Sequence, residues 1–222
     1  MELSIDTASE IASIALSREG ELIAEITWRC RRNHTVELLP TIETLLMQAG
    51  SSKDDLSAIF ACTGPGMYTG LRVGISVAQG LARALSLPAV GVGRLELDAY
   101  PHAAFPGAII ATHRAGRGEI AWAAYRGDPW REIAAPQLSR PETLAQEAGE
   151  TTLFVGEVDQ TLAHILNHAA AQRAVIATPT ASIRRAGTLA QLAYWRLSAG
   201  AQSEAALLRP IYLRPPAIGP QR

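Results

Sequence analysis

Residues 62–74 form a glycine-rich turn that constrains the fold of this chain more than any other segment. The turn reads Cys-Thr-Gly-Pro-Gly-Met-Tyr-Thr-Gly-Leu-Arg-Val-Gly and separates a strand-like apolar run from a helix-like one. Glycine adopts backbone conformations that other residues avoid, and Pro65 fixes its own φ. A turn of this kind either holds an anion with its N–H groups or lets two backbones approach closely.

Phosphate-binding signatures do not fit this turn. A P-loop needs a lysine after its last glycine, and no lysine follows Lys53 in the chain. The dinucleotide fingerprint fails by one residue, because Thr69 stands where the third glycine belongs. Gly70, Gly74 and Ala78 then place small residues on one face of the following helix. We therefore predict a packing turn, with Thr69 as the N-cap of a helix that pairs closely with another backbone.

The composition is that of a globular protein. Of 222 residues, 48% are hydrophobic and 18% charged, with 21 acidic against 20 basic side chains. This balance indicates neither a disordered chain nor a strongly basic nucleic-acid binder. Cys30 and Cys62 lack the spacing of a disulfide framework or a metal site. The sequence shows no signal-peptide pattern and no apolar run of ~20 residues, so we expect a cytoplasmic protein with no membrane partner.

Hydrophobic periodicity predicts the elements of the first half. Residues 3–28 alternate as a three-stranded antiparallel meander, followed by a helix over 35–49, a strand over 56–63, a helix over 69–85, a strand over 89–92 and a helix from about 95. This order predicts an α/β fold with a mixed sheet. Pro40 removes a helical hydrogen bond, so we expect a kink there or a helix start nearer Leu38.

A second lobe is predicted after Pro101 and Pro106. It begins with a hairpin of residues 108–112 and 120–125, and continues with helices over 141–148, 159–171 and 183–197 and strands over 152–155 and 174–176. We therefore divide the chain into a first lobe (1–105), a second, smaller and more helical lobe (106–214) and a mobile, proline-rich tail (215–222).

Three further patterns each have a functional and a simpler structural interpretation. His164 and His168 share a helix face as zinc ligands do, but no third ligand is evident, which favours a half-exposed pair. Asp6 follows the first strand, where a carboxylate hydrogen-bonds the next turn or holds a hydrated metal near phosphate, and the turn role is favoured. A basic cluster touches RNA phosphate or is a solvated strand end. Its residues are Arg29, Arg31 and Arg32.

Four motifs together resemble the TsaB family, also called YeaZ-like proteins. They are Ile5-Asp6-Thr7, Asn33-His34-Thr35 with Leu38-Leu39-Pro40, Gly64-Pro65-Gly66-x-x-Thr69-Gly70-Leu71-Arg72-x-Gly74, and Pro210-Ile211-Tyr212-Leu213-Arg214. The resemblance implies an actin-like, sugar-kinase-like (ribonuclease H-like) fold with a reduced second lobe. It also implies a non-catalytic scaffold subunit that binds TsaD, the catalytic subunit that transfers threonylcarbamoyl to the tRNA adenosine beside the anticodon.

The same resemblance implies the partners and cofactors. TsaD or a second copy of the chain binds the first-lobe helices, whereas TsaE and tRNA are reached only through the complex. By this resemblance the chain has no cofactor and no metal of its own, and an ATP or ADP site is expected only at the interface with the partner subunit. TsaD carries a metal-binding His-x3-His, but here Leu38 follows His34 at that spacing. Arg114 stands where relatives commonly have an aspartate.

An apolar helical stripe beside the small-residue groove supplies the candidate interface. Its residues are Leu38, Leu39, Ile42, Leu45, Leu46, Gly70, Leu71, Val73, Gly74, Val77, Ala78 and Leu81. The candidate nucleotide contacts within the complex are Asp6, Thr7, Thr63, Gly64, Gly66, Thr69 and Arg72. The alternative function is an ATP-dependent phosphotransferase or a metallopeptidase that acts alone through Asp6, Thr7 and the 62–70 turn. That alternative lacks a general base, a phosphate lysine and a metal triad.

Overall fold

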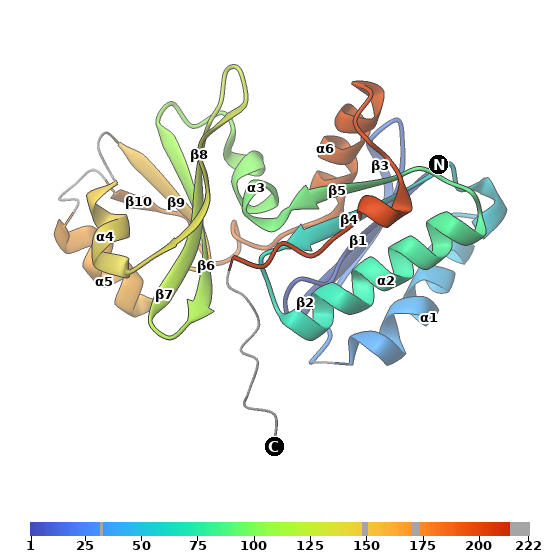
Figure 1. The fold of residues 1–222 in the computed structure, drawn as a ribbon, viewed down its shortest axis with the longest axis horizontal. Helices are drawn as coiled ribbons and strands as arrows, with labels where there is room; N and C mark the ends of the chain where they lie inside the picture. Colours follow the sequence, from blue (N-terminus) through green and yellow to red (C-terminus); the bar gives the residue numbers. More distant parts are fainter. Residues whose placement is uncertain (32, 148–150, 170–173, 214–222) are drawn as a thin grey trace.

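The computed structural model describes residues 1–31, 33–147, 151–169 and 174–213. The chain forms two five-stranded mixed sheets, each with helices on both faces (Figure 1). This is the two-sheet α/β architecture that the sequence predicted. The tail predicted over 215–222 lies outside the described residues, and the division of the chain at residue 105 stays a prediction.

The first sheet has the strand order β3-β2-β1-β4-β5. Its strands are β1 (Glu2–Asp6), β2 (Ile11–Arg18), β3 (Glu21–Arg29), β4 (Ala58–Gly64) and β5 (Ala89–Gly93). β1, β2 and β3 form the predicted antiparallel meander, and β4 joins β1 in parallel. Side chains alternate between the faces. Leu3 and Ile5 therefore enter one apolar core, whereas Asp6 reaches the opposite side at the end of β1.

Helices α1 (His34–Gln48) and α2 (Tyr68–Ala84) cover one face of this sheet. α1 begins at His34 and runs through Pro40, so of the two alternatives for this proline the start nearer Leu38 is wrong, and the kink stays a prediction. Burial of Leu38, Ile42 and Leu45 against the sheet holds the turn that lacks one hydrogen bond. Thr69 is not the N-cap of α2, because Met67 occupies that position and Thr69 lies within the first turn.

The second sheet repeats the strand order of the first, as β8-β7-β6-β9-β10. Its strands are β6 (Ala108–Gly116), β7 (Glu119–Arg126), β8 (Arg131–Ser139), β9 (Thr152–Gly156) and β10 (Ala174–Ile176), with α4 (Pro141–Gln146) and α5 (Gln160–Ala169) on one face. The sequence did not predict β8, which contains Pro136 and lies at the sheet edge, where a proline is tolerated. Within the described residues the second sheet thus has as many strands as the first.

Two helices are exchanged between the halves. α3 (Arg94–Ala99) follows β5 but packs Leu95 and Ala99 on the second sheet. α6 (Ala186–Ser198) follows β10 but packs Leu189 and Leu192 on the first. Figure 1 shows α3 between the two sheets and α6 against the first sheet, beside β5 and β3. Short 3-10 turns complete the described structure at Lys53–Asp55, Tyr100–His102 and Ala205–Leu207. Each half therefore supplies a helix to the core of the other.

Candidate functional site

The glycine turn packs against the chain segment that follows β1. A Cβ atom on Gly70 would lie 2.2 Å from the carbonyl oxygen of Thr7, and one on Gly74 would lie 2.1 Å from the Oγ1 atom of Thr7. The Thr7 hydroxyl donates a hydrogen bond to the carbonyl oxygen of Gly70 over 2.8 Å. The Met67 N–H donates to the carbonyl oxygen of Ala8 over 2.9 Å. The close-approach interpretation of the turn is confirmed.

This packing corrects the predicted partner groove. Gly70, Gly74 and Ala78 are buried, and the first two receive the chain's own residue Thr7 rather than another protein. Five apolar members of the predicted interface are likewise at most 8% exposed: Leu38, Ile42, Leu45, Leu46 and Leu71. Helical periodicity marks the face of a helix that is buried, and here that face meets the chain's own sheet.

The remaining members of the predicted interface do reach the surface. Leu39 is 49% exposed, and Val73, Val77 and Leu81 are partly exposed. The prediction missed two α1 side chains that are more exposed, Val36 (72%) and Met47 (73%). Both are apolar residues outside the buried stripe of α1, and this pattern in the sequence could have identified them. We name the outer surface of α1 and α2 formed by Val36, Leu39, Met47, Val73, Val77 and Leu81 the outer helix face.

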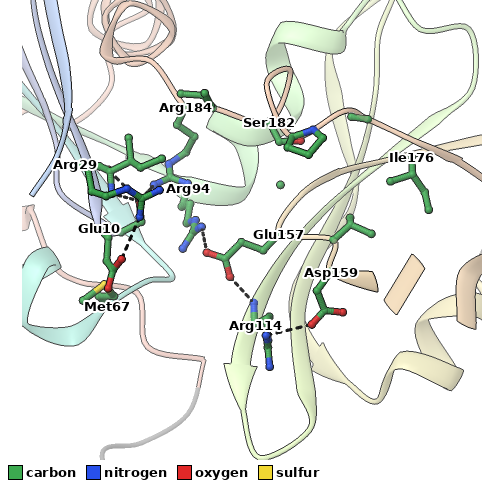
Figure 2. A pocket seen from close by; sticks show the side chains of 17 residues that line it. Glu10, Arg29, Met67, Arg94, Arg114, Glu157, Asp159, Ile176, Ser182 and Arg184 are labelled. Carbon is green, nitrogen blue, oxygen red and sulfur yellow. Dashed lines mark hydrogen bonds and ion pairs between the residues drawn. The ribbon is translucent and has the colours of Figure 1, made fainter. Parts of the chain in front are cut away.

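A second candidate site is a cavity of about 1010 Å³ between the two sheets (Figure 2). On one side Arg29 pairs with Glu10 over 3.3 Å, and on the other Arg114 pairs with Asp159 over 3.1 Å. Arg184 also lines the cavity. The charged side chains of this cavity are thus engaged with one another.

A chain of largely buried ion pairs lies at the wall of the cavity. Arg184, which precedes α6, contacts Asp6 at 2.8 Å and Asp98 of α3 at 3.4 Å. Arg94, one helical turn before Asp98, contacts it at 3.5 Å and reaches Glu157 after β9 at 2.5 Å. The Nδ1 atom of His113 on β6 donates to the Glu157 carboxylate over 3.0 Å and lies 2.8 Å from a guanidinium nitrogen of Arg94. The network therefore connects the carboxyl ends of β1 and β9, one in each sheet.

The pKa values in this network follow from burial and pairing. Burial raises the pKa of Asp6, but Arg184 and the Ala8 N–H outweigh it and hold this pKa below its usual value. Burial dominates at Asp98, whose pKa is raised although both arginines oppose it. At Glu157 the hydrogen bond from His113 and the charge of Arg94 overcome burial and lower the pKa. Burial lowers the pKa of His113. Asp6 and Glu157 are therefore held as carboxylates.

Most of the predicted nucleotide contacts are buried or bonded within this chain. The two carboxylate oxygens of Asp6 accept from Ala8 N–H (2.9 Å) and from Arg184 (2.8 Å), and the Asp6 residue is 1% exposed. Thr7 is bonded to α2, Thr63 is 7% exposed, Gly64 is buried, and a Cβ on Gly66 would touch the Ala8 carbonyl. Only Thr69 and Arg72 of this set are exposed. The residues present do not fit a nucleotide held by this chain alone.

The other sequence patterns do not assemble a site. His164 and His168 lie exposed on α5 with their rings 6.5 Å apart. Among the described residues, no three His, Cys, Asp or Glu side chains gather where they could hold a metal ion. Arg31 is exposed, and Arg32 lies outside the described residues. No helix of the described chain has both the length and the apolar character to cross a bilayer.

Comparisons with known proteins converge on one family. The family model "TsaD: tRNA N6-adenosine threonylcarbamoyltransferase" matches residues 26–218. The tRNA threonylcarbamoyladenosine biosynthesis protein TsaB of Escherichia coli is 37% identical over 145 residues, which cover 63% of this chain and 62% of that protein. TsaB of Haemophilus influenzae is 31% identical over 166 residues and is matched over 69% of its length.

A solved structure extends the likeness to the whole chain. A Pseudomonas aeruginosa protein described as similar to the peptidase YeaZ superposes with a TM-score of 0.81 at 30% identity. This superposition covers 96% of this chain and 99% of that one. The sequence match to the E. coli relative spans less than two thirds of its length, whereas the structural match spans nearly all of its counterpart.

Proposed function

The chain belongs to the TsaB (YeaZ-like) family, and from that premise we propose that it is a non-catalytic subunit that binds TsaD. The named relatives are proteins of tRNA threonylcarbamoyladenosine biosynthesis, and the matching family model is that of the TsaD transferase itself. A chain that matches the family model of a transferase, but whose Asp6 and Thr7 are bonded to its own residues, is suited to pair with it. TsaE and tRNA then meet this chain within the assembled complex.

The outer helix face is the observation that carries this proposal. Val36, Leu39 and Met47 are 72%, 49% and 73% exposed on one helix, and α2 adds partly exposed valines and a leucine. Isolated exposed apolar residues are ordinary, but a group on two neighbouring helices is typical of a protein-binding surface. The helices themselves are held rigidly by the core beneath them. TsaD, or a second copy of the chain in its absence, would cover this face.

The bonding of Asp6 within the chain supports a non-catalytic role rather than the enzyme alternative. A phosphotransferase or metallopeptidase acting through Asp6 needs a carboxylate that is free to take a proton or a metal ion. Here Asp6 is bonded to Arg184 and to backbone. We expect the isolated chain to release phosphate from Mg-ATP no faster than buffer. ATP hydrolysis that co-elutes with the protein in gel filtration would favour the enzyme alternative instead.

Leu39→Arg is expected to weaken TsaD binding at least tenfold. A guanidinium at the centre of an apolar contact must be desolvated without a partner, and tenfold corresponds to about 1.4 kcal/mol. Co-purification and calorimetric titration with TsaD measure the effect. Ile133→Arg is the matched control, since Ile133 is 45% exposed on β8 of the other sheet.

Folding must be equal in the two variants, as judged by circular dichroism and melting temperature. Undiminished TsaD binding by Leu39→Arg would exclude the outer helix face as the contact surface. Failure of the unmodified chain to bind TsaD would overturn the proposed function itself. A Gly74→Arg substitution is unsuited to this test, because its Cβ would collide with Thr7 and disturb folding.

A further inference from the structure

Two tyrosine rings and an arginine guanidinium group form an exposed stacked cluster at the start of α2. Tyr68 is the first residue of the helix, and its ring stacks on that of Tyr212 with centroids 5.4 Å apart and an interplanar angle of 29°. Arg72 lies one turn later, with its Cζ atom 4.1 Å from the centroid of Tyr68. Tyr68 is 45% exposed and Tyr212 is 38% exposed. We call these three residues the tyrosine platform.

The platform is fixed by hydrogen bonds of the chain itself. The Ile211 N–H donates to the carbonyl oxygen of Thr63 over 2.8 Å, which holds the neighbouring Tyr212 beside the glycine turn. Gln79 of α2 donates to the carbonyl oxygen of Leu208 over 2.9 Å. The Nε atom of Arg72 donates to the Tyr212 hydroxyl over 3.3 Å. Groups that are ordered before binding lose less entropy when a ligand arrives.

A groove and further cations adjoin the platform. Tyr212 lines a cavity of about 320 Å³ together with Gly66 and Met67 on one side and His113 and Arg114 on the other. The Arg114 side chain is 66% exposed, and its pairing with Asp159 leaves most of it in solvent. Arg117, at the β6–β7 turn, is also exposed. Exposed guanidinium groups thus occur both on the platform and across the groove from it.

We propose that the tyrosine platform stacks an unpaired base of RNA, so that this subunit contacts the tRNA substrate directly. Single-stranded RNA is recognised by stacking its bases on tyrosine rings and guanidinium planes. Arginines beside the stack neutralise the phosphates that follow. The overall charge of −1 gives the chain little general attraction for RNA, so affinity has to come from this local group and from the partner. The inference rests on the proposed function and adds an RNA contact to it.

The test measures RNA and TsaD binding on the same variants. Fluorescence anisotropy follows an unmodified tRNA transcript and its isolated anticodon stem–loop against the full chain, alone and bound to TsaD, at low and high salt. Tyr68→Ala and Tyr212→Ala are each expected to weaken RNA binding about tenfold, in the lower part of the range for one stacked base. Tyr212→Phe keeps the ring and is expected to bind within about twofold of the parent.

Trp195→Ala provides the control, since Trp195 is an exposed aromatic side chain on α6. RNA binding unchanged in both tyrosine-to-alanine variants, with the fold intact, would overturn the platform. A loss of TsaD affinity that equals the loss of RNA affinity would also overturn it, because the cluster would then be a protein contact. Loss of RNA binding with unchanged TsaD affinity is the supporting result. The proposed function fails separately, if the unmodified chain does not bind TsaD.

Discussion

Replacing Arg184 with methionine is expected to lower the free energy of unfolding by about 3–5 kcal/mol, the usual cost of leaving a buried charge without its partner. The Arg184 side chain is 7% exposed and is bonded to Asp6 and Asp98, which are 2% and 0% exposed. Methionine fills much of the same volume but leaves the two carboxylates with Arg94 alone nearby. Urea denaturation at neutral pH, followed by circular dichroism, measures the loss.

The structure also predicts how the free energy of unfolding of the Arg184→Met variant changes with pH. In the parent, the pKa of Asp6 lies below its unfolded value of about 3.9, so the pair stabilises the fold above that pH and the contribution is lost as pH falls through the folded pKa. Without Arg184, burial raises the pKa of Asp6 above the unfolded value and raises that of Asp98, already elevated in the parent, further. The free energy of unfolding of the variant then increases as pH falls from neutral through the raised pKa values.

Arg29→Met is the control for this prediction. Arg29 pairs with Glu10 in solvent, with side chains 58% and 46% exposed, so its loss is expected to change stability by less than about 1 kcal/mol. Equal effects of the two substitutions, or a variant at Arg184 that still loses stability in acid as the parent does, would show that the buried network contributes no more than a surface ion pair.

Gly70→Ala is expected to destabilise the protein by about 3 kcal/mol, the upper end for an overpacked site. The new methyl group would lie 2.2 Å from the carbonyl oxygen of Thr7, and a backbone atom cannot rotate out of the way as a side chain can. Relief requires α2 to move away from β1, which would break the bond between the Thr7 hydroxyl and residue 70. Thermal denaturation followed by circular dichroism gives the shift.

A glycine on the same helix offers a control substitution that is expected to change stability in the opposite direction. Gly80 is exposed on α2, and a Cβ atom built there meets nothing within 4 Å. Gly80→Ala is therefore expected to stabilise the protein by up to about 1 kcal/mol, because alanine favours the helix. Destabilisation by both substitutions would mean that the helix backbone, and not the contact with Thr7, decides the outcome.

Local patterns predicted most of the elements but not the partners of those elements. Alternation in residues 3–28 and helical spacing in 35–49 and 69–85 reflect burial of one face, which is a property of each segment alone. Spacing also showed that Gly70 and Gly74 mark a close approach. It did not show what approaches, and Thr7 lies 63 residues before Gly70 in the chain. The groove was therefore assigned to another protein.

The ion-pair network could not be predicted from the sequence for a related reason. Asp6 and Arg184 are separated by 178 residues, and single charged residues carry no periodicity that would connect them. The strand β8 was missed because Pro136 argues against a strand unless that strand is known to be an edge. Edge position, like pairing across the cleft, is a property of the assembled sheets.

The exchanged helices have a consequence for how the chain acquires its structure during synthesis. The first sheet is complete in its strands by residue 93, yet α6 supplies a large part of the cover of one of its faces, beside Leu97 and Tyr100. Until that helix emerges, a nascent chain carries Phe60, Val90 and Val92 without their contacts to Leu189, Leu192 and Ala193. The contacts that finish the earliest sheet are therefore among the last to form, and the protein is expected to fold in one cooperative step near the end of translation.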